Sequence, residues 1–332
     1  MDLRSPSRRR AIAISGAYVP AALFALASRP AAARQARLGP FNAELRRFSL
    51  GAFEVTTISD AEAMIDGPWP IIGEDQPREA MDRLMRDNVL PERRFQPGFT
   101  PTIVNTGNEL VLFDTGNGAE GFVPRPAGGR LASRLSGAGI DPAAIDVVVL
   151  THAHIDHIGG LMEAGRPVFS NARYVIGRSE YAFWADDDRL TSSANSLVAK
   201  SARLFRRNIV PFRSKTTMIS PGEDVVSGIR AIAASGHTPG HLAFHIESQG
   251  RRMLLWGDAA HQEVASLMRP DWHVSFDMDK TAAASTRRAI YDMAATDRVL
   301  VAGYHTTFPS LGFLERVGVG YRWIPLTYQM NA

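Results

Sequence analysis

The chain of 332 residues contains no cysteine. This absence excludes disulfide bonds, cysteine nucleophiles and metal sites built on thiolates. Any bound metal must therefore be held by nitrogen and oxygen ligands.

The sequence also lacks the marks of several other protein classes. It has no internal repeat and no GxxxxGK[ST] stretch, and no segment beyond the N-terminal region is apolar enough to span a membrane. The formal charge is +3, but residues 1–33 carry five arginines against one aspartate, so the remainder has a net charge of −1. A nearly neutral chain lacks the excess of basic residues with which proteins bind nucleic acid, and we expect a small-molecule substrate instead.

The first 33 residues have the composition of a bacterial export signal. An arginine run at residues 8–10 precedes an apolar run at 11–27 and small residues at 31–33, and it resembles the twin-arginine type. A basic tail and an uncleaved anchor are alternatives, but the apolar run is shorter than the roughly 20 residues of a spanning helix. We therefore expect a signal at 1–33, a domain at 34–332, and a periplasmic or secreted protein without a stable membrane span after signal removal.

After a lead-in at residues 34–50, strand-like and helix-like segments are mixed throughout the chain. Helices are expected over 128–139, near 180–184, and over 195–207 and 281–295. Apolar runs bounded by turn residues predict strands, which lie at 53–59, 101–106, 109–116, 145–150, 172–177, 229–235, 241–248, 251–258 and 298–303. This mixture predicts one α/β domain.

Three histidines and one aspartate lie within six residues of the stretch THAHIDHIGG, residues 151–160. The stretch follows the buried strand at 145–150, and α/β folds place their sites at such strand ends. Residues two apart in extended backbone point the same way, so His152 and His154 can reach one ion together. Asp156 and His157 follow where the chain turns into a helix and can face a second ion. Because burying these groups unpaired is costly, the cluster predicts a metal site.

Three more residues of ligand type follow strand-like runs: His237 in ASGHTPGH, Asp258 in LLWGDAA and His305 in AGYHTTFP. If these three residues were only solvent-exposed polar residues, there would be no reason for each of them to follow a strand-like run. The other histidines of the later chain are given no ligand role, because a lone loop histidine is more often a surface or hydrogen-bonded residue: His241, His245, His261 and His273.

Residues 116–121 fit the pattern GxGxxG, and Asp141 stands at the spacing of a dinucleotide site. However, FVPRP follows directly, and its two prolines prevent the required helix start. We therefore predict a turn here.

The ordered set of the HAHIDH stretch, His237, Asp258 and His305 resembles the metallo-β-lactamase superfamily. FEVTTISD, VNTGNELVLFDTG, ASGHTPGH, HTTFPSLG and GVGYRWIPLTY look like its methyl parathion hydrolase branch, which consists of exported bacterial hydrolases. The resemblance implies an αββα sandwich and a possible homodimer. It also implies a ligand set: His152, His154 and His237 for one ion, Asp156, His157 and His305 for the other, with Asp258 bridging both.

Two such ions, roughly 3.5–4 Å apart, share a water and lower its pKa to about 7. Asp258 and Asp156 are the expected catalytic carboxylates. Zinc is the default metal for these ligands, and manganese, cobalt and iron remain alternatives.

Two aromatic residues, Phe122 and Trp184, resemble pocket residues of that branch, although core positions explain the pair equally well. Phe183 fits either place, and all three are candidate substrate-binding residues. The expected function is hydrolysis of an ester, a lactone or a phosphotriester. The alternatives are an acyl-homoserine-lactone-type lactonase, an iron-dependent redox member of the superfamily, and a protein whose metals are only structural.

Overall fold

A buried valine run forms the centre of the first of two sheets. All four residues of β7 (Val147–Leu150) are buried, as expected for a strand with parallel neighbours on both sides. The sheet has seven strands, in the spatial order β1 (Leu45–Leu50), β2 (Phe53–Ile58), β5 (Thr102–Asn105), β6 (Leu110–Phe113), β7, β10 (Arg173–Gly177) and β11 (Thr216–Ile219).

The second sheet also has seven strands and is drawn from the later part of the chain. Their spatial order follows the sequence: β12 (Asp224–Val226), β13 (Ile229–Ala233), β14 (Leu242–Ser248), β15 (Arg251–Leu255), β16 (Leu300–Ala302), β17 (Leu311–Val317) and β18 (Gly320–Pro325). Two small hairpins accompany the sheets, made of β3 (Ile65–Asp66) with β4 (Arg94–Phe95) and of β8 (Met162–Glu163) with β9 (Arg166–Pro167).

Side chains cap the two long helices. Ser196 accepts from the backbone N–H of Ala199 in one, and Asp279 accepts from that of Ala282 in the other. The helices are α1 (Arg78–Asp87), α2 (Leu131–Gly137), α3 (Ile155–Ile158), α4 (Arg178–Ala185), α5 (Leu197–Asn208), α6 (Ala265–Met268) and α7 (Lys280–Thr296). Among the described residues, no helix is both long and apolar enough to cross a membrane.

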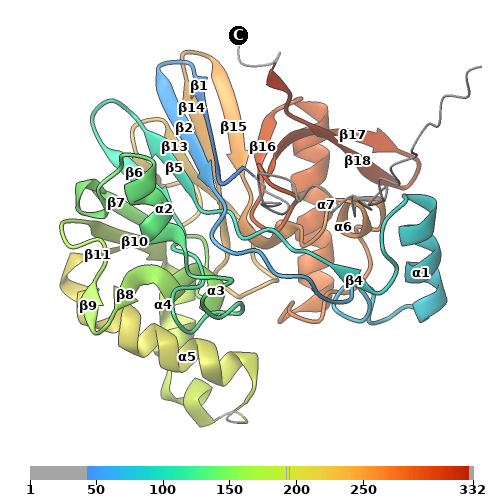
Figure 1. The fold of residues 1–332 in the computed structure, drawn as a ribbon, viewed down its shortest axis with the longest axis horizontal. Coiled ribbons are helices and arrows are strands. Elements are labelled where there is room, and N and C mark those ends of the chain that lie inside the picture. The colour runs from blue at the N-terminus through green and yellow to red at the C-terminus, as the bar shows by residue number, and fades with distance from the viewer. Residues whose placement is uncertain (1–42, 192, 194, 329–332) are drawn as a thin grey trace, which may run out of the picture. The chain divides into compact units, whose positions relative to one another are not determined.

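Three apolar cores define the layers. Val147, Val149 and Phe113 of the first sheet pack against Phe244 and other residues of the second. The outer face of the first sheet is covered by α2, α4 and α5, and that of the second by α7 (Figure 1). This arrangement is an αββα sandwich, which confirms the expected fold.

The computed structural model describes residues 43–191, 193 and 195–328, and the export signal predicted at 1–33 lies outside these residues. Within them, the segment read as a lead-in contains β1, which forms a hairpin with β2 through Gly51 in the left-handed region. The β17–β18 hairpin and α1 were also missed. The stretch 116–121 forms turns, as predicted, and no helix starts there.

Candidate metal centre

The predicted ligands all lie at the carboxyl ends of strands. His152 and His154 follow β7, and the side chains of Asp156 and His157 project from α3 immediately after them. The loops after β13, β15 and β16, which run in the same direction, carry the other three ligands. The structure therefore brings together all seven predicted residues in two buried groups: His152, His154, His237 and Asp258, and Asp156, His157 and His305.

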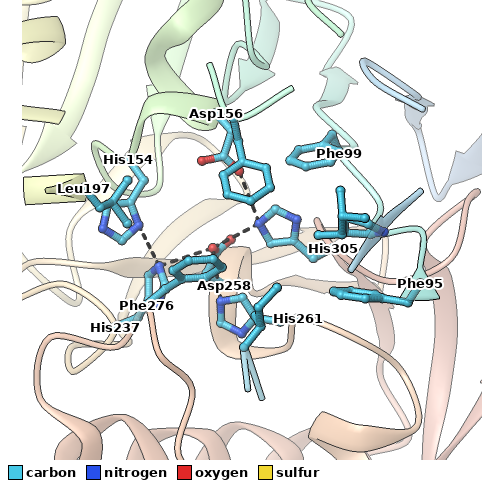
Figure 2. A pocket seen from close by; sticks show the side chains of 14 residues that line it. Phe95, Phe99, His154, Asp156, Leu197, His237, Asp258, His261, Phe276 and His305 are labelled. Carbon is cyan, nitrogen blue, oxygen red and sulfur yellow. Dashed lines mark hydrogen bonds and ion pairs between the residues drawn. The ribbon is translucent and has the colours of Figure 1, made fainter. Parts of the chain in front are cut away.

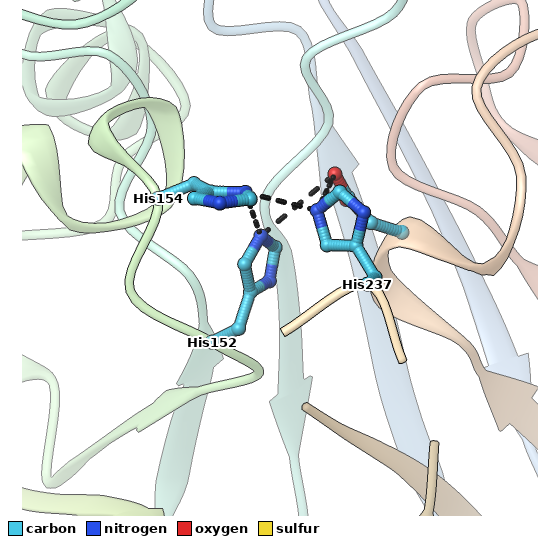
Figure 3. A group of neighbouring side chains, drawn as sticks. His152, His154 and His237 are labelled. Atoms are coloured by element: carbon cyan, nitrogen blue, oxygen red, sulfur yellow. Dashed lines mark hydrogen bonds and ion pairs between the residues drawn. The ribbon is translucent and has the colours of Figure 1, made fainter. Parts of the chain in front are cut away.

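Three imidazoles of the first group converge on one point. His154 Nδ1 lies 3.1 Å from His152 Nε2 and 2.9 Å from His237 Nε2 (Figure 3). The prediction that His152 and His154 point the same way is confirmed.

Asp258 lies between the two groups. Its Oδ2 is 3.2 Å from His237 Nε2 and 3.1 Å from His305 Nε2, while its Oδ1 is 3.1 Å from His157 Nε2. Asp156 Oδ2 lies 3.4 Å from His305 Nε2. One carboxylate therefore reaches ligands of both groups, as a bridging ligand must.

The far nitrogen of each of three histidines has its own partner. Nδ1 of His157 lies 2.8 Å from Asp114, and Nδ1 of His237 lies 2.9 Å from Asp277. His305 Nδ1 donates to the carbonyl oxygen of Gly98 at 2.7 Å. These contacts fix each ring so that Nε2 faces the site.

This orientation is the test of whether metal ions fit. In a neutral imidazole whose Nδ1 carries the hydrogen, Nε2 is an acceptor, and here it faces an acceptor oxygen of Asp258. His157 Nε2 and Asp258 Oδ1 are buried and make no hydrogen bond. Lone pairs that face each other at about 3 Å are stabilised by a cation between them, and nitrogen and oxygen ligands suit Zn²⁺ and its neighbours. The residues therefore fit two divalent ions.

The pKa values of the three histidines of the first group are shifted in different directions. Burial and the neighbouring imidazoles hold the pKa values of His152 and His154 well below their usual range, which favours the neutral, metal-binding form. Burial opposes protonation of His237 too, but the carboxylates of Asp258 and Asp277 outweigh it and raise its pKa to about 9. Burial raises the pKa of Asp258 and the surrounding histidines lower it, so that the net pKa is well below normal and the group is ionised.

A pocket of about 480 Å³ opens above the ligands. Apolar side chains form its wall, and His154, Asp156, His237, Asp258 and His305 form its base (Figure 2). The lining of the wall comes from four separate segments: Ile65, Ile71, Phe95, Pro97 and Phe99; Phe122; Leu197; and His261 with Phe276.

Of the three aromatic residues predicted to line the pocket, the structure places Phe122 there. It is 38% exposed, and its ring packs on those of Phe99 and Phe276. Trp184 is fully buried behind His154, and Phe183 packs beneath Arg189, so neither belongs to the lining. The prediction for these two is corrected, because α4 turns them towards the core of the first layer.

Two histidines that were given no ligand role take different parts. His241 is buried and satisfied, since Nδ1 donates to the carbonyl of Ala234 and Nε2 accepts from the N–H of Asp258. His261 is 5% exposed and lines the pocket, and neither of its ring nitrogens makes a hydrogen bond. Its position three residues after Asp258 is the signal in the sequence that was available for it.

Comparisons with known proteins agree with this geometry. The sequence profile of the metallo-beta-lactamase superfamily matches residues 100–305. The chain belongs to this superfamily. Its two buried groups of histidine and aspartate side chains fit the dimetal site of a metal-dependent hydrolase.

Among curated relatives, the probable metallo-hydrolase YflN of Bacillus subtilis is 32% identical over 46% of this chain and 56% of its own length. The N-acyl homoserine lactonase AttM of Agrobacterium fabrum is 27% identical over 39% of this chain and 46% of its own. The matches thus span about half the length of these relatives.

Among solved structures, the dizinc quorum-quenching lactonase AidC is similar with a TM-score of 0.77 and 24% identity, over 86% of this chain and 98% of its own. The hydrolase AbOPH of the β-lactamase superfamily has a TM-score of 0.79 and 24% identity, over 87% of this chain and 99% of its own. At this identity the likeness establishes the fold alone.

Proposed function

We propose that this chain hydrolyses neutral lactones and carboxylic esters that carry an apolar group, with aryl phosphotriesters as the second substrate class. The observation that carries the proposal is the pocket. Among its described lining residues there is no lysine or arginine, and the polar side chains are those at the metal site and His261. Such a wall accepts an uncharged, apolar substrate and offers no counter-charge to an anionic one.

When bound, the two ions supply a hydroxide at neutral pH and polarise the substrate's carbonyl or phosphoryl oxygen. Asp258, ionised and central to both groups, orients the attacking group and accepts its proton. Asp156 is the second catalytic carboxylate, because it belongs to the ligand set and also lines the open pocket. The apolar wall excludes bulk water and so strengthens these charge interactions.

Two further observations favour a lactone. Several curated relatives are N-acyl homoserine lactonases, and the lactonase AidC is in complex with a product, an N-acyl-L-homoserine. Stretches such as HTTFPSLG that resemble the methyl parathion hydrolase branch motivate the phosphotriester as the alternative.

The experiment is a substrate panel on the purified domain loaded with Zn²⁺. We expect turnover of acyl lactones and p-nitrophenyl esters, with methyl parathion as the test of the second class. Inactivity on all three, despite two bound ions per chain, would overturn the proposal. His154→Ala is the matched variant, which should lose turnover and remain folded; if it kept full activity, the metals would be structural.

Metal analysis of the protein as purified addresses the iron-dependent alternative. We expect zinc, or manganese or cobalt, and no consumption of oxygen during turnover. A ferrous enzyme that consumes oxygen would instead establish the redox reading.

We further propose export through the twin-arginine route and assembly as a homodimer. Cell fractionation with Arg8 and Arg9 changed to lysine tests the first, because the loss of both arginines should hold the protein in the cytoplasm. Light scattering tests the second.

A further inference from the structure

A buried glutamate outside the ligand set makes an unusually complete group of hydrogen bonds. Glu180 lies in the first turn of α4 and is fully buried. Its Oε1 accepts from the backbone N–H of Ala153 at 2.9 Å and from Nε1 of Trp184 at 2.6 Å. Its Oε2 accepts from Oγ1 of Thr238 at 2.7 Å and from the backbone N–H of Gly240 at 3.0 Å.

These four donors lie beside three metal ligands. Ala153 stands between His152 and His154, while Thr238 follows His237 directly. Trp184, which the same carboxylate holds, places its ring 6.0 Å from that of His154. One carboxylate therefore connects both loops that supply the three-histidine group.

The contact between α4 and the second loop is too close for a side chain. A Cβ on Gly240 would lie 2.0 Å from the backbone nitrogen of Glu180. Glycine at 240 thus lets the loop lie directly against the start of α4, where Glu180 reaches it.

The other ligand group has different supports. His157 is held by Asp114, and His305 by the carbonyl of Gly98. The hydroxyl of Tyr304 donates to the backbone carbonyl of Asp156 at 2.6 Å. None of these contacts involves Glu180.

We propose that Glu180 is a positioning residue that sets the spacing of His152, His154 and His237 and thereby the affinity for one of the two ions. The inference rests on the dimetal site and is independent of which substrate the enzyme cleaves. Ring nitrogens 2.9–3.1 Å apart tolerate little movement of either loop. Loss of a hydrogen bond made directly to a metal ligand typically lowers metal affinity about 10–100-fold. Glu180 bonds to residues that adjoin the ligands, so its loss should act at the lower end of that range.

Glu180→Gln is the informative change, because glutamine keeps the shape and one acceptor oxygen. Its amide NH₂ must face one pair of donors. Thr238 can accept from it, but the N–H of Gly240 or of Ala153 would then lose its acceptor. One of the two loops is therefore released while the core stays filled.

The test is a titration of the metal-free protein with Zn²⁺ against a chelator, which resolves the two binding steps. We expect Glu180→Gln to weaken one step about tenfold and leave the other within twofold. The weakened step should be the one lost in His154→Ala and retained in His157→Ala. In protein loaded with Co²⁺ in place of Zn²⁺, Glu180→Gln should change the absorption bands of one of the two ions and leave those of the other unchanged.

A matched control separates positioning from general stability. Asp60 is also fully buried and accepts from four donors, on Asn117, Gly129 and Leu131, but none of them adjoins a metal ligand. Asp60→Asn should lower the thermal midpoint and leave both binding steps unchanged. Thr238→Ser should keep full affinity, while Thr238→Val and Trp184→Phe, which each remove one donor, should weaken the same step by less.

Equal weakening of both steps, or no change in either, would overturn the proposal. If Glu180→Gln fails to fold, Thr238→Val and Trp184→Phe replace it in the titration. Selective weakening of the same step would support the proposal, and equal weakening of both steps or no change would overturn it. Inactivity of the wild-type chain on lactones would refute the proposed function and leave this titration unaffected.

Discussion

Replacing His261 by phenylalanine removes two buried ring nitrogens that make no hydrogen bond and keeps a planar ring in place. The ring packs against those of His305 and Phe276, with centroids 5.6 Å and 6.3 Å away. Its Nε2 lies 3.5 Å from Asp258 Oδ2, beyond the usual hydrogen-bond range. Burial lowers the pKa of His261, which keeps the ring uncharged.

An unsatisfied buried polar group costs about 1–3 kcal/mol, so His261→Phe should raise the free energy of unfolding by that order. Substrate is expected to provide the missing partner, and the loss of one hydrogen bond to it should lower kcat/KM about threefold to tenfold. The two effects have opposite consequences, stability rising while activity falls. Urea unfolding of the Zn²⁺-loaded proteins at equal free metal, together with lactone kinetics, measures both.

His241→Phe is the matched control, because that histidine is equally buried but has both ring nitrogens hydrogen-bonded. The same substitution there should lower the free energy of unfolding by at least about 1 kcal/mol. If His261→Phe destabilised the protein as much as His241→Phe, or left kcat/KM unchanged, the view of His261 as an unpaired substrate-facing group would be wrong.

Three other changes give distinct outcomes. Phe122→Ala should raise KM about tenfold for long-chain lactones and little for short ones, because it removes half-exposed apolar wall; steady-state kinetics across chain lengths would show it. Asp277→Asn removes the anionic partner of His237 Nδ1 and of Arg287, and should weaken metal binding about 10–100-fold in chelator competition. Burial raises the pKa of Tyr174 to about 12, so the unfolded chain loses this proton first and stability falls as pH rises from about 10 to 12. Tyr174→Phe should make that slope shallower in urea unfolding at alkaline pH without abolishing it, because the pKa of Tyr321 is also raised to about 12. An unchanged slope would contradict the assignment.

The metal ligands were predictable because the local sequence pattern and the topology of the sheets both place these residues at the same strand ends. The run VVVL of β7 allows little but a buried strand, and a spacing of two directs His152 and His154 to one side. His237, Asp258 and His305 each follow such a strand, and parallel strand ends meet at one edge.

The pocket wall was not predictable in the same way. Phe183 and Trp184 are adjacent aromatic residues near the site in sequence, but the rotation of α4 turns them into the core. Phe99 and Phe276 come from irregular segments without periodicity, so no pattern indicates which face they present. The partners of the ligands, Glu180 and Asp277 among them, lie far away in sequence and become neighbours only through the packing of the layers.

The most direct test of the account is a single titration of the metal-free domain with Zn²⁺ while the rate of acyl-lactone ring opening is followed. Because Asp258 joins both ligand groups, hydrolysis should require both ions, and the rate should reach its plateau at two equivalents per chain. Full activity at one equivalent or without metal, or no lactone hydrolysis at two, would contradict it.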